Sequence, residues 1–152
     1  MVGDMVYENS RGIRGWWEIK GKNFEKLLFI LHRLSGVVVG LYFILHIFET
    51  STILNGEEDW KSLMEFLKNP FAHTGLLIVA FLSVFHALNG IRLIFAEQGL
   101  LIGKMRRQGY PIVSFSLTGI QRKMGWFVIL LTFILALYAF YHLFIVSLGV
   151  RF

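Results

Sequence analysis

Three long apolar segments constrain this chain more than any other feature of its sequence. They cover residues 27–48, 71–95 and 124–148. Each can cross a bilayer, because a membrane span needs roughly 20 mostly apolar residues at a rise of about 1.5 Å per residue. Composition agrees, since 55% of the residues are hydrophobic and 16% are charged, whereas soluble domains are about a quarter charged. The sequence predicts an all-α membrane protein.

We expect one domain, residues 1–152, whose helix boundaries follow from the flanking polar residues. The transmembrane helices are predicted at about 25–50, 71–97 and 122–149. Residues 1–23 pair tryptophans with lysines and suit the cytoplasmic membrane interface. Residues 57–70 place apolar side chains at helical spacing, which predicts a short amphipathic helix before the second span.

The absence of cysteine limits the cofactor chemistry of the chain. It excludes disulfides, Cys-ligated iron–sulfur clusters and covalent c-type haem attachment. A redox protein of this composition must hold its cofactor through histidine, methionine or non-covalent contacts. The first apolar segment is too long and starts too late for a signal peptide, and no small-residue cleavage site follows it.

The charge distribution predicts how the chain crosses the membrane. Lysines and arginines gather in residues 1–33 and 104–123, whereas residues 49–70 carry five acids and two lysines. The positive-inside rule then puts the N-terminus and the second connection in the cytoplasm and the C-terminus outside. The basic face reflects this topology alone, or it also docks an acidic partner or anionic lipid. We expect no nucleic-acid partner.

The histidines are the first candidate functional residues. The chain has five, namely His32, His46, His73, His86 and His142. His46 and His86 lie well inside their spans, where a polar side chain costs free energy unless it is satisfied. A main-chain carbonyl or a hydroxyl can satisfy a neutral imidazole, or the imidazole binds a metal. His73 and His142 lie near the outer span ends, where they cap the interface or contact haem propionates.

The neighbours of the two deep histidines favour haem. Gly90 lies one turn from His86 on the same helix face and gives the clearance that a flat macrocycle needs. The face that carries His46 combines small, branched and polar residues, which is unusual for lipid contact. Gly36 and Gly40 form a G-x-x-x-G pair, for which close helix packing is the simpler explanation.

The same histidines are predicted to lie at different depths. His46 follows Lys26 by 20 residues, and His86 precedes Glu97 by 11. At 1.5 Å per residue, the two imidazoles differ in depth by on the order of 10 Å. They therefore suit one axial ligand each to two haem irons. Each iron then needs a histidine from another chain, so the three helices form half of a haem-binding bundle completed by a second anchor subunit.

Polar side chains at the inner ends of the first two spans suit a quinone. His32, Arg33 and Ser35 lie close together in the first span, and Arg92 lies near the inner end of the second. Arg33 either snorkels to the interface or joins His32 and Ser35 in donating hydrogen bonds to a quinone. His32, Arg33 and Arg92 are also candidate contacts of haem propionates. A quinone that gains two electrons needs two protons, so its site must lie within reach of donors and water.

Two motifs resemble a known family. "LHRLSG" at 31–36 and "FHALNGIRLIF" at 85–95 follow the patterns H-R-x-[ST]-G and H-x-x-x-G-I-R. In this order and spacing the chain resembles the cytochrome b membrane-anchor subunit of succinate dehydrogenase, complex II, over roughly residues 24–149. Residues 36–54 are also similar to the first span of di-haem fumarate reductase anchors.

The resemblance implies a function and a set of site residues. Such anchors bind b-type haem and quinone, and dock an iron–sulfur subunit that receives electrons from a flavoprotein oxidising succinate. The usual haem ligand falls on His86 and the extra ligand of the di-haem variety on His46. The quinone-site arginine falls on Arg33, with His32 beside it. A serine commonly stands three residues before that histidine, and this chain has Phe29 there.

We therefore expect the electron-transfer and quinone-binding subunit of a respiratory, tricarboxylic-acid-cycle enzyme in a prokaryotic plasma membrane. One alternative is a mono-haem anchor in which His46 is merely packed. Others are a fumarate reductase anchor, or a non-redox helical membrane subunit that uses its histidines for proton relay or packing.

Overall fold

The structure, a computed structural model, describes residues 24–100 and 119–147. These residues form helices and short connections, with no strand among them. The elements are α2 (Phe24–Ser51), the 3₁₀ turn η1 (Thr52–Asn55), α3 (Glu57–Leu67), α4 (Pro70–Glu97), α5 (Ile120–Phe140) and the π-helix η2 (Tyr141–Ser147). Three helical segments are long and apolar enough to cross a membrane: Phe24–Asn55, Pro70–Glu97 and Ile120–Ser147. The predicted all-α membrane class is confirmed.

Two parts of the sequence-based prediction lie outside the described residues. They are the interfacial segment 1–23 and most of the basic connection before the third span. The third span differs from its prediction near its end, because α-helix gives way to π-helix at Tyr141. The predicted amphipathic helix is confirmed as α3, which stops at Leu67.

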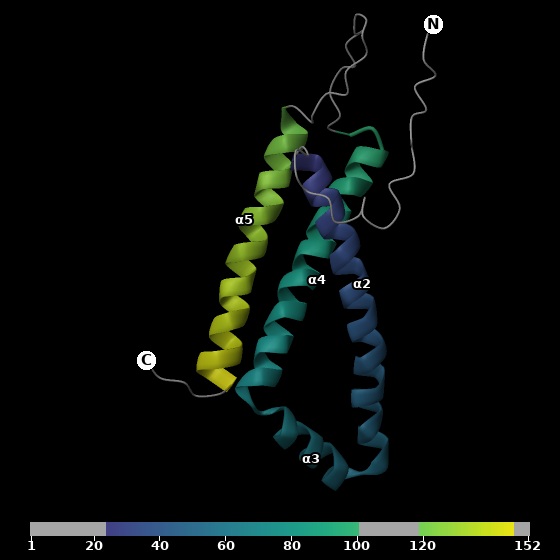
Figure 1. The fold of residues 1–152 in the computed structure, drawn as a ribbon, viewed down its shortest axis with the longest axis vertical. Helices are drawn as coiled ribbons and strands as arrows, with labels where there is room; N and C mark the ends of the chain where they lie inside the picture. Colours follow the sequence, from purple (N-terminus) through teal and green to yellow (C-terminus); the bar gives the residue numbers. More distant parts are fainter. Residues whose placement is uncertain (1–23, 101–118, 148–152) are drawn as a thin grey trace, which may run out of the picture.

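The helix α4 is the centre of the bundle, with α2 packed on one side and α5 on the other. Figure 1 shows α2 and α4 close together at the end where α2 begins, and farther apart toward the end where α3 lies. We call these the proximal and the distal end. The apolar core sits at the proximal end, where Leu28, Phe85 and Val128 from the three helices meet.

Polar side chains are about as common as apolar ones among the buried residues of this bundle. The buried polar side chains are Ser35, His73, Asn89, Arg92, Gln121 and Thr132. Large apolar side chains instead cover the outside, and on the distal half of α2 Leu41, Ile44 and Phe48 are each more than half exposed. Lipid tails are as apolar as leucine, so helices in a bilayer associate through close packing and hydrogen bonds rather than by hiding apolar surface. The buried polar side chains between the helices are therefore the candidates for a functional site.

The distal connection is organised by Asn69. Its side-chain oxygen accepts a hydrogen bond from Ala72 N at 2.8 Å, and its amide donates to Phe66 O at 2.7 Å. Asn69 thus caps the start of α4 and holds the end of α3. Pro70 is the first residue of α4, where its missing N–H costs no helical hydrogen bond.

Substituting Asn69 tests this double cap. We expect Asn69→Ala to lower the free energy of unfolding by about 1 kcal/mol, as for other lost N-caps. Thermal unfolding of the purified membrane complex, followed by circular dichroism, measures the change. Asn55→Ala is the control, because Asn55 is exposed and makes no side-chain hydrogen bond to the described residues. An equal effect of both substitutions would contradict the role of Asn69.

Candidate functional site

The imidazole of His86 lies against α2 near the proximal end. Its Nδ1 is 3.1 Å from the main-chain oxygen of His32 and 3.2 Å from Ser35 Oγ. The ring of His32 stacks on it, with centroids 4.1 Å apart and planes within 2°. The three α2 residues His32, Ser35 and Gly36 therefore form a seat for one side chain of α4.

The hydrogen bonds of this seat fix which nitrogen of His86 carries the proton. The Ser35 hydroxyl donates its single hydrogen to His32 O at 2.9 Å, so toward His86 it can only accept. The carbonyl of His32 can also only accept. Neutral His86 is therefore protonated on Nδ1, and the lone pair lies on Nε2. Nε2 has no hydrogen-bond partner among the described residues.

Gly36 is the glycine that makes room for His86. A Cβ added there would lie 2.8 Å from Cε1 of His86, closer than real Cβ atoms approach. A Cβ at Gly90 would meet Cε1 of His32 at 3.5 Å, an ordinary contact, and one at Gly40 would meet nothing within 4 Å. Close packing explains Gly36, as predicted, but Gly40 has no such contact with the described residues. The haem-clearance role of Gly90 stays a prediction.

A second polar cluster joins the proximal end of α4 to the start of α5. The guanidinium of Arg92, 4% exposed, donates to Asn89 Oδ1 at 2.9 Å and to Gln121 Oε1 at 3.4 Å. Gln121 in turn donates to Leu100 O at 3.5 Å. Sequence reasoning missed Gln121, because it lies at a span boundary where a polar residue is expected to meet water.

Two buried nitrogens near these clusters have no partner among the described residues. They are Nδ1 of His32 and Nδ2 of Asn89. Buried polar atoms in proteins are nearly always hydrogen-bonded. Arg92 adds a buried positive charge, which donates to the neutral Asn89 and Gln121 among the described residues and interacts electrostatically with Glu25. The proximal interior therefore offers donors and positive charge to a group from outside the described chain.

Arg33 and Phe29 lie on the exposed surface of the same turn of α2. The guanidinium carbon of Arg33 is 5.2 Å from the centroid of the Phe29 ring, and Lys26 Nζ is also 5.2 Å from it. These are cation–π distances. The ring of Phe29 therefore packs beneath the charge of Arg33.

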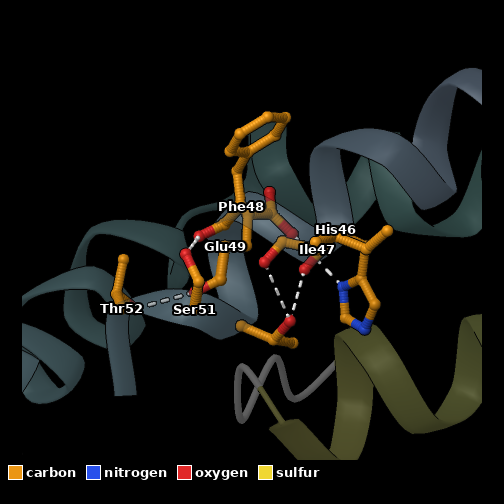
Figure 2. A network of polar contacts seen from close by, with 7 residues as sticks. His46, Ile47, Phe48, Glu49, Ser51 and Thr52 are labelled. Atoms are coloured by element: carbon orange, nitrogen blue, oxygen red, sulfur yellow. Dashed lines mark hydrogen bonds and ion pairs between the residues drawn. The ribbon is translucent and has the colours of Figure 1, made fainter. Parts of the chain in front are cut away.

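His46 lies near the distal end of α2, away from the seat of His86. Figure 2 shows its ring beside Glu49, with Nδ1 3.4 Å from Oε2, and the side chains are 46% and 37% exposed. A carboxylate oxygen accepts, so Nδ1 is the donor in neutral His46, and Nε2 has no hydrogen-bond partner among the described residues. The hydroxyls of Thr50, Ser51 and Thr52 donate to carbonyls one turn earlier and do not compete for the imidazole.

The two deep histidines lie at different levels of the bundle, as the sequence predicts. His86 is level with Gly36, and His46 follows Gly36 by ten residues on α2. At 1.5 Å per residue this is about 15 Å of helix. Among the described residues, no three His, Asp or Glu side chains gather as a metal-ion site.

The remaining histidines differ from each other. His73 is buried, with Nδ1 3.0 Å from Asn69 O and Nε2 3.2 Å from Ser147 Oγ, so it ties the start of α4 to the end of η2. His142 is exposed, and its ring contacts the rings of Tyr138 and Tyr141. The arrangement of His73 is the one expected of a cap.

Comparison with known proteins identifies the family. The family model described as succinate dehydrogenase/fumarate reductase transmembrane subunit matches residues 17–121, more than half of the chain. A protein of Halobacterium salinarum named succinate dehydrogenase hydrophobic membrane anchor subunit is 35% identical over 95 residues, which is 60% of this chain and 69% of that protein. A protein of the same name from Rickettsia felis is 33% identical over 93 residues, 61% and 72% of the two chains. No solved structure matches. The chain therefore belongs to the family of succinate dehydrogenase and fumarate reductase transmembrane subunits.

Proposed function

We propose that this chain is the cytochrome b anchor of a succinate:quinone oxidoreductase. In this role it holds an iron–sulfur subunit and its flavoprotein at the membrane and helps to form the site where quinone is reduced. Family membership supports the anchor role. The single observation that carries the haem and quinone assignment is the seat of His86, which holds Nδ1 and leaves Nε2 without a hydrogen-bond partner among the described residues.

The residues around His86 fit a haem iron. Ligating histidines almost always donate their other ring N–H to a carbonyl or carboxylate, which fixes the tautomer and the ring orientation. Nδ1 of His86 has this bond to the His32 carbonyl. A satisfied core histidine would also bond its Nδ1 in this way, and the free Nε2 separates the two explanations. Haem bound there would supply a one-electron redox centre for electron transfer to quinone.

The proximal donors fit the propionates of the same haem. His32 Nδ1 is buried without a partner among the described residues, and Arg92 carries a buried positive charge. Burying a charge is costly unless an opposite charge or hydrogen bonds compensate. A haem carboxylate would accept a hydrogen bond from His32 Nδ1 and would join Glu25 in offsetting the charge of Arg92. Arg33 is exposed on the neighbouring surface of α2, and we propose that it contacts a propionate or the quinone.

Quinone reduction needs donors at a surface that quinone can reach. Arg33 is exposed over Phe29 at the proximal end, and the ring of His32 lies one residue away in the chain. We assign Arg33 to hold the quinone oxygen that gains negative charge, and His32 to donate a proton nearby. Phe29 replaces a hydroxyl contact with an aromatic surface on which the quinone ring can rest.

His46 fits a second haem that this chain holds at the distal end. Its Nδ1 is paired with the carboxylate of Glu49, the other common partner of ligating histidines. The exposure of His46 means that this chain alone does not enclose the group. We propose that a second anchor subunit covers this face and gives the opposite ligand to each iron.

His46→Ala tests the distal assignment. In the purified complex with all its subunits, we expect loss of one of two b haems, measured as haem per flavin by the pyridine haemochrome method. His142→Ala is the matched control, because it removes another exposed distal histidine, and should keep both haems. One haem in the wild-type complex, unchanged by His46→Ala, would establish the mono-haem alternative. A colourless wild-type complex would favour a non-redox subunit.

A further inference from the structure

We propose that Ser35 is a positioning residue for His86, and that it acts on the imidazole rather than on the quinone. This inference rests on the proposed haem role of His86. The order of residues in the first span favours a quinone contact for Ser35, because it follows His32 and Arg33. The contacts of its hydroxyl give it a different task.

Ser35 is 0% exposed and its hydroxyl points between α2 and α4. A quinone carbonyl oxygen accepts hydrogen bonds, so a protein contact to it must donate. The only hydrogen of the Ser35 hydroxyl is already given to His32 O at 2.9 Å. The Ser35 hydroxyl is fully buried and already donates its hydrogen within α2, so it is a poor donor to a ligand that enters from the membrane.

The hydroxyl of Ser35 donates to the His32 carbonyl and is also a second acceptor for the Nδ1–H of His86. In an α-helix that carbonyl accepts the N–H four residues later, and here it lies within bonding distance of Ser35 Oγ and His86 Nδ1 as well. A carbonyl has two lone pairs, too few for three full hydrogen bonds. Ser35 Oγ, 3.2 Å from Nδ1, shares the proton of His86 and keeps it on that nitrogen.

The other sides of the ring are fixed by packing rather than by hydrogen bonds. His32 stacks on one face at 4.1 Å, and Gly36 lies against the edge that carries Cε1. The hydrogen bonds of Nδ1 to His32 O and Ser35 Oγ therefore set the rotation of the imidazole about its bond to Cβ. Sharing Nδ1–H with two acceptors makes the ring a stronger electron donor through Nε2, which stabilises the ferric state of a bound haem.

Ser35→Ala in the complete complex tests the proposal, with Ser51→Ala as the matched control. Ser51 also donates to a carbonyl three residues earlier on α2, at 2.7 Å, but no histidine bonds its oxygen. We expect Ser35→Ala to raise the midpoint potential of the haem held by His86. At the wild-type midpoint potential, the ferrous-to-ferric ratio of this haem should therefore rise at least about threefold. A tenfold rise in that ratio would correspond to a shift of about 59 mV for one electron. The KM for quinone should stay within about twofold, well below the loss of a binding contact.

A second variant keeps the proposal testable if Ser35→Ala fails to fold. Ser35→Cys keeps a group of similar shape with a weaker acceptor, so its potential should lie between those of wild type and Ser35→Ala. An unchanged potential in both variants, with a raised KM for quinone, would overturn the proposal and return Ser35 to the quinone site. Absence of haem from the wild-type complex would instead refute the proposed function, so the two failures are distinguishable.

Discussion

His86→Ala is expected to remove the proximal haem from the assembled complex. The substitution deletes the imidazole whose Nδ1 is held by His32 O and Ser35 Oγ, and nothing else on α4 at that level offers a ligand. Haem per flavin should fall by one equivalent, with loss of the matching band in the reduced-minus-oxidised visible spectrum. Added imidazole should restore part of that band, because it can occupy the space left by the side chain.

A matched histidine on the same helix controls for general damage. His73→Ala removes a buried imidazole whose two nitrogens are both hydrogen-bonded within the chain. We expect this variant to lower thermal stability and to leave both haem bands unchanged. Full haem content in His86→Ala would contradict the assignment of the proximal ligand.

Gly36→Val should have the next largest effect, because it fills the space that His86 occupies. Even a Cβ would stand 2.8 Å from Cε1 of His86, and overpacking of this kind costs about 1–3 kcal/mol. The imidazole cannot swing aside without breaking its bonds to α2, so we expect lower thermal stability together with a changed or lost proximal haem spectrum. Both are measured on the same purified complex.

Gly40→Val separates this effect from general intolerance of valine in α2. Gly40 lies one turn later, and a Cβ there meets nothing within 4 Å in this chain. We expect its proximal haem spectrum to match the wild type. If Gly36→Val retained a normal spectrum and stability, the packing of His86 against α2 would be wrong.

The sequence predicts the helices of this chain well, because span length and hydropathy depend on local composition. Pro70 and the acids and tryptophan of α3 likewise signal their boundaries locally. The change to π-helix at Tyr141 carries no such signal, since the apolar pattern continues through it.

The site was predictable only in part. Periodicity put His86 and Gly90 on one face of α4, but it could not say which residues of α2 face them. That depends on the axial register of α2 against α4. Gly36 and Ser35 determine this register through their contacts with His86, which lies 50 or more residues away in sequence. The link from Arg92 to Gln121 depends on the same three-dimensional register. The sequence therefore suggested a quinone role for Ser35, where the structure shows a contact with His86.

A redox-titrated visible spectrum of the intact wild-type complex tests the central proposal most directly. The account predicts b-type haem bands that titrate as two components, because the two candidate ligands lie in different surroundings about 15 Å apart along α2. His86 has neutral acceptors and buried positive charge nearby, whereas His46 has the carboxylate of Glu49. Two resolved midpoint potentials, both reached on adding succinate or dithionite, are the expected result. A spectrum without any haem band in the wild-type complex would contradict the account.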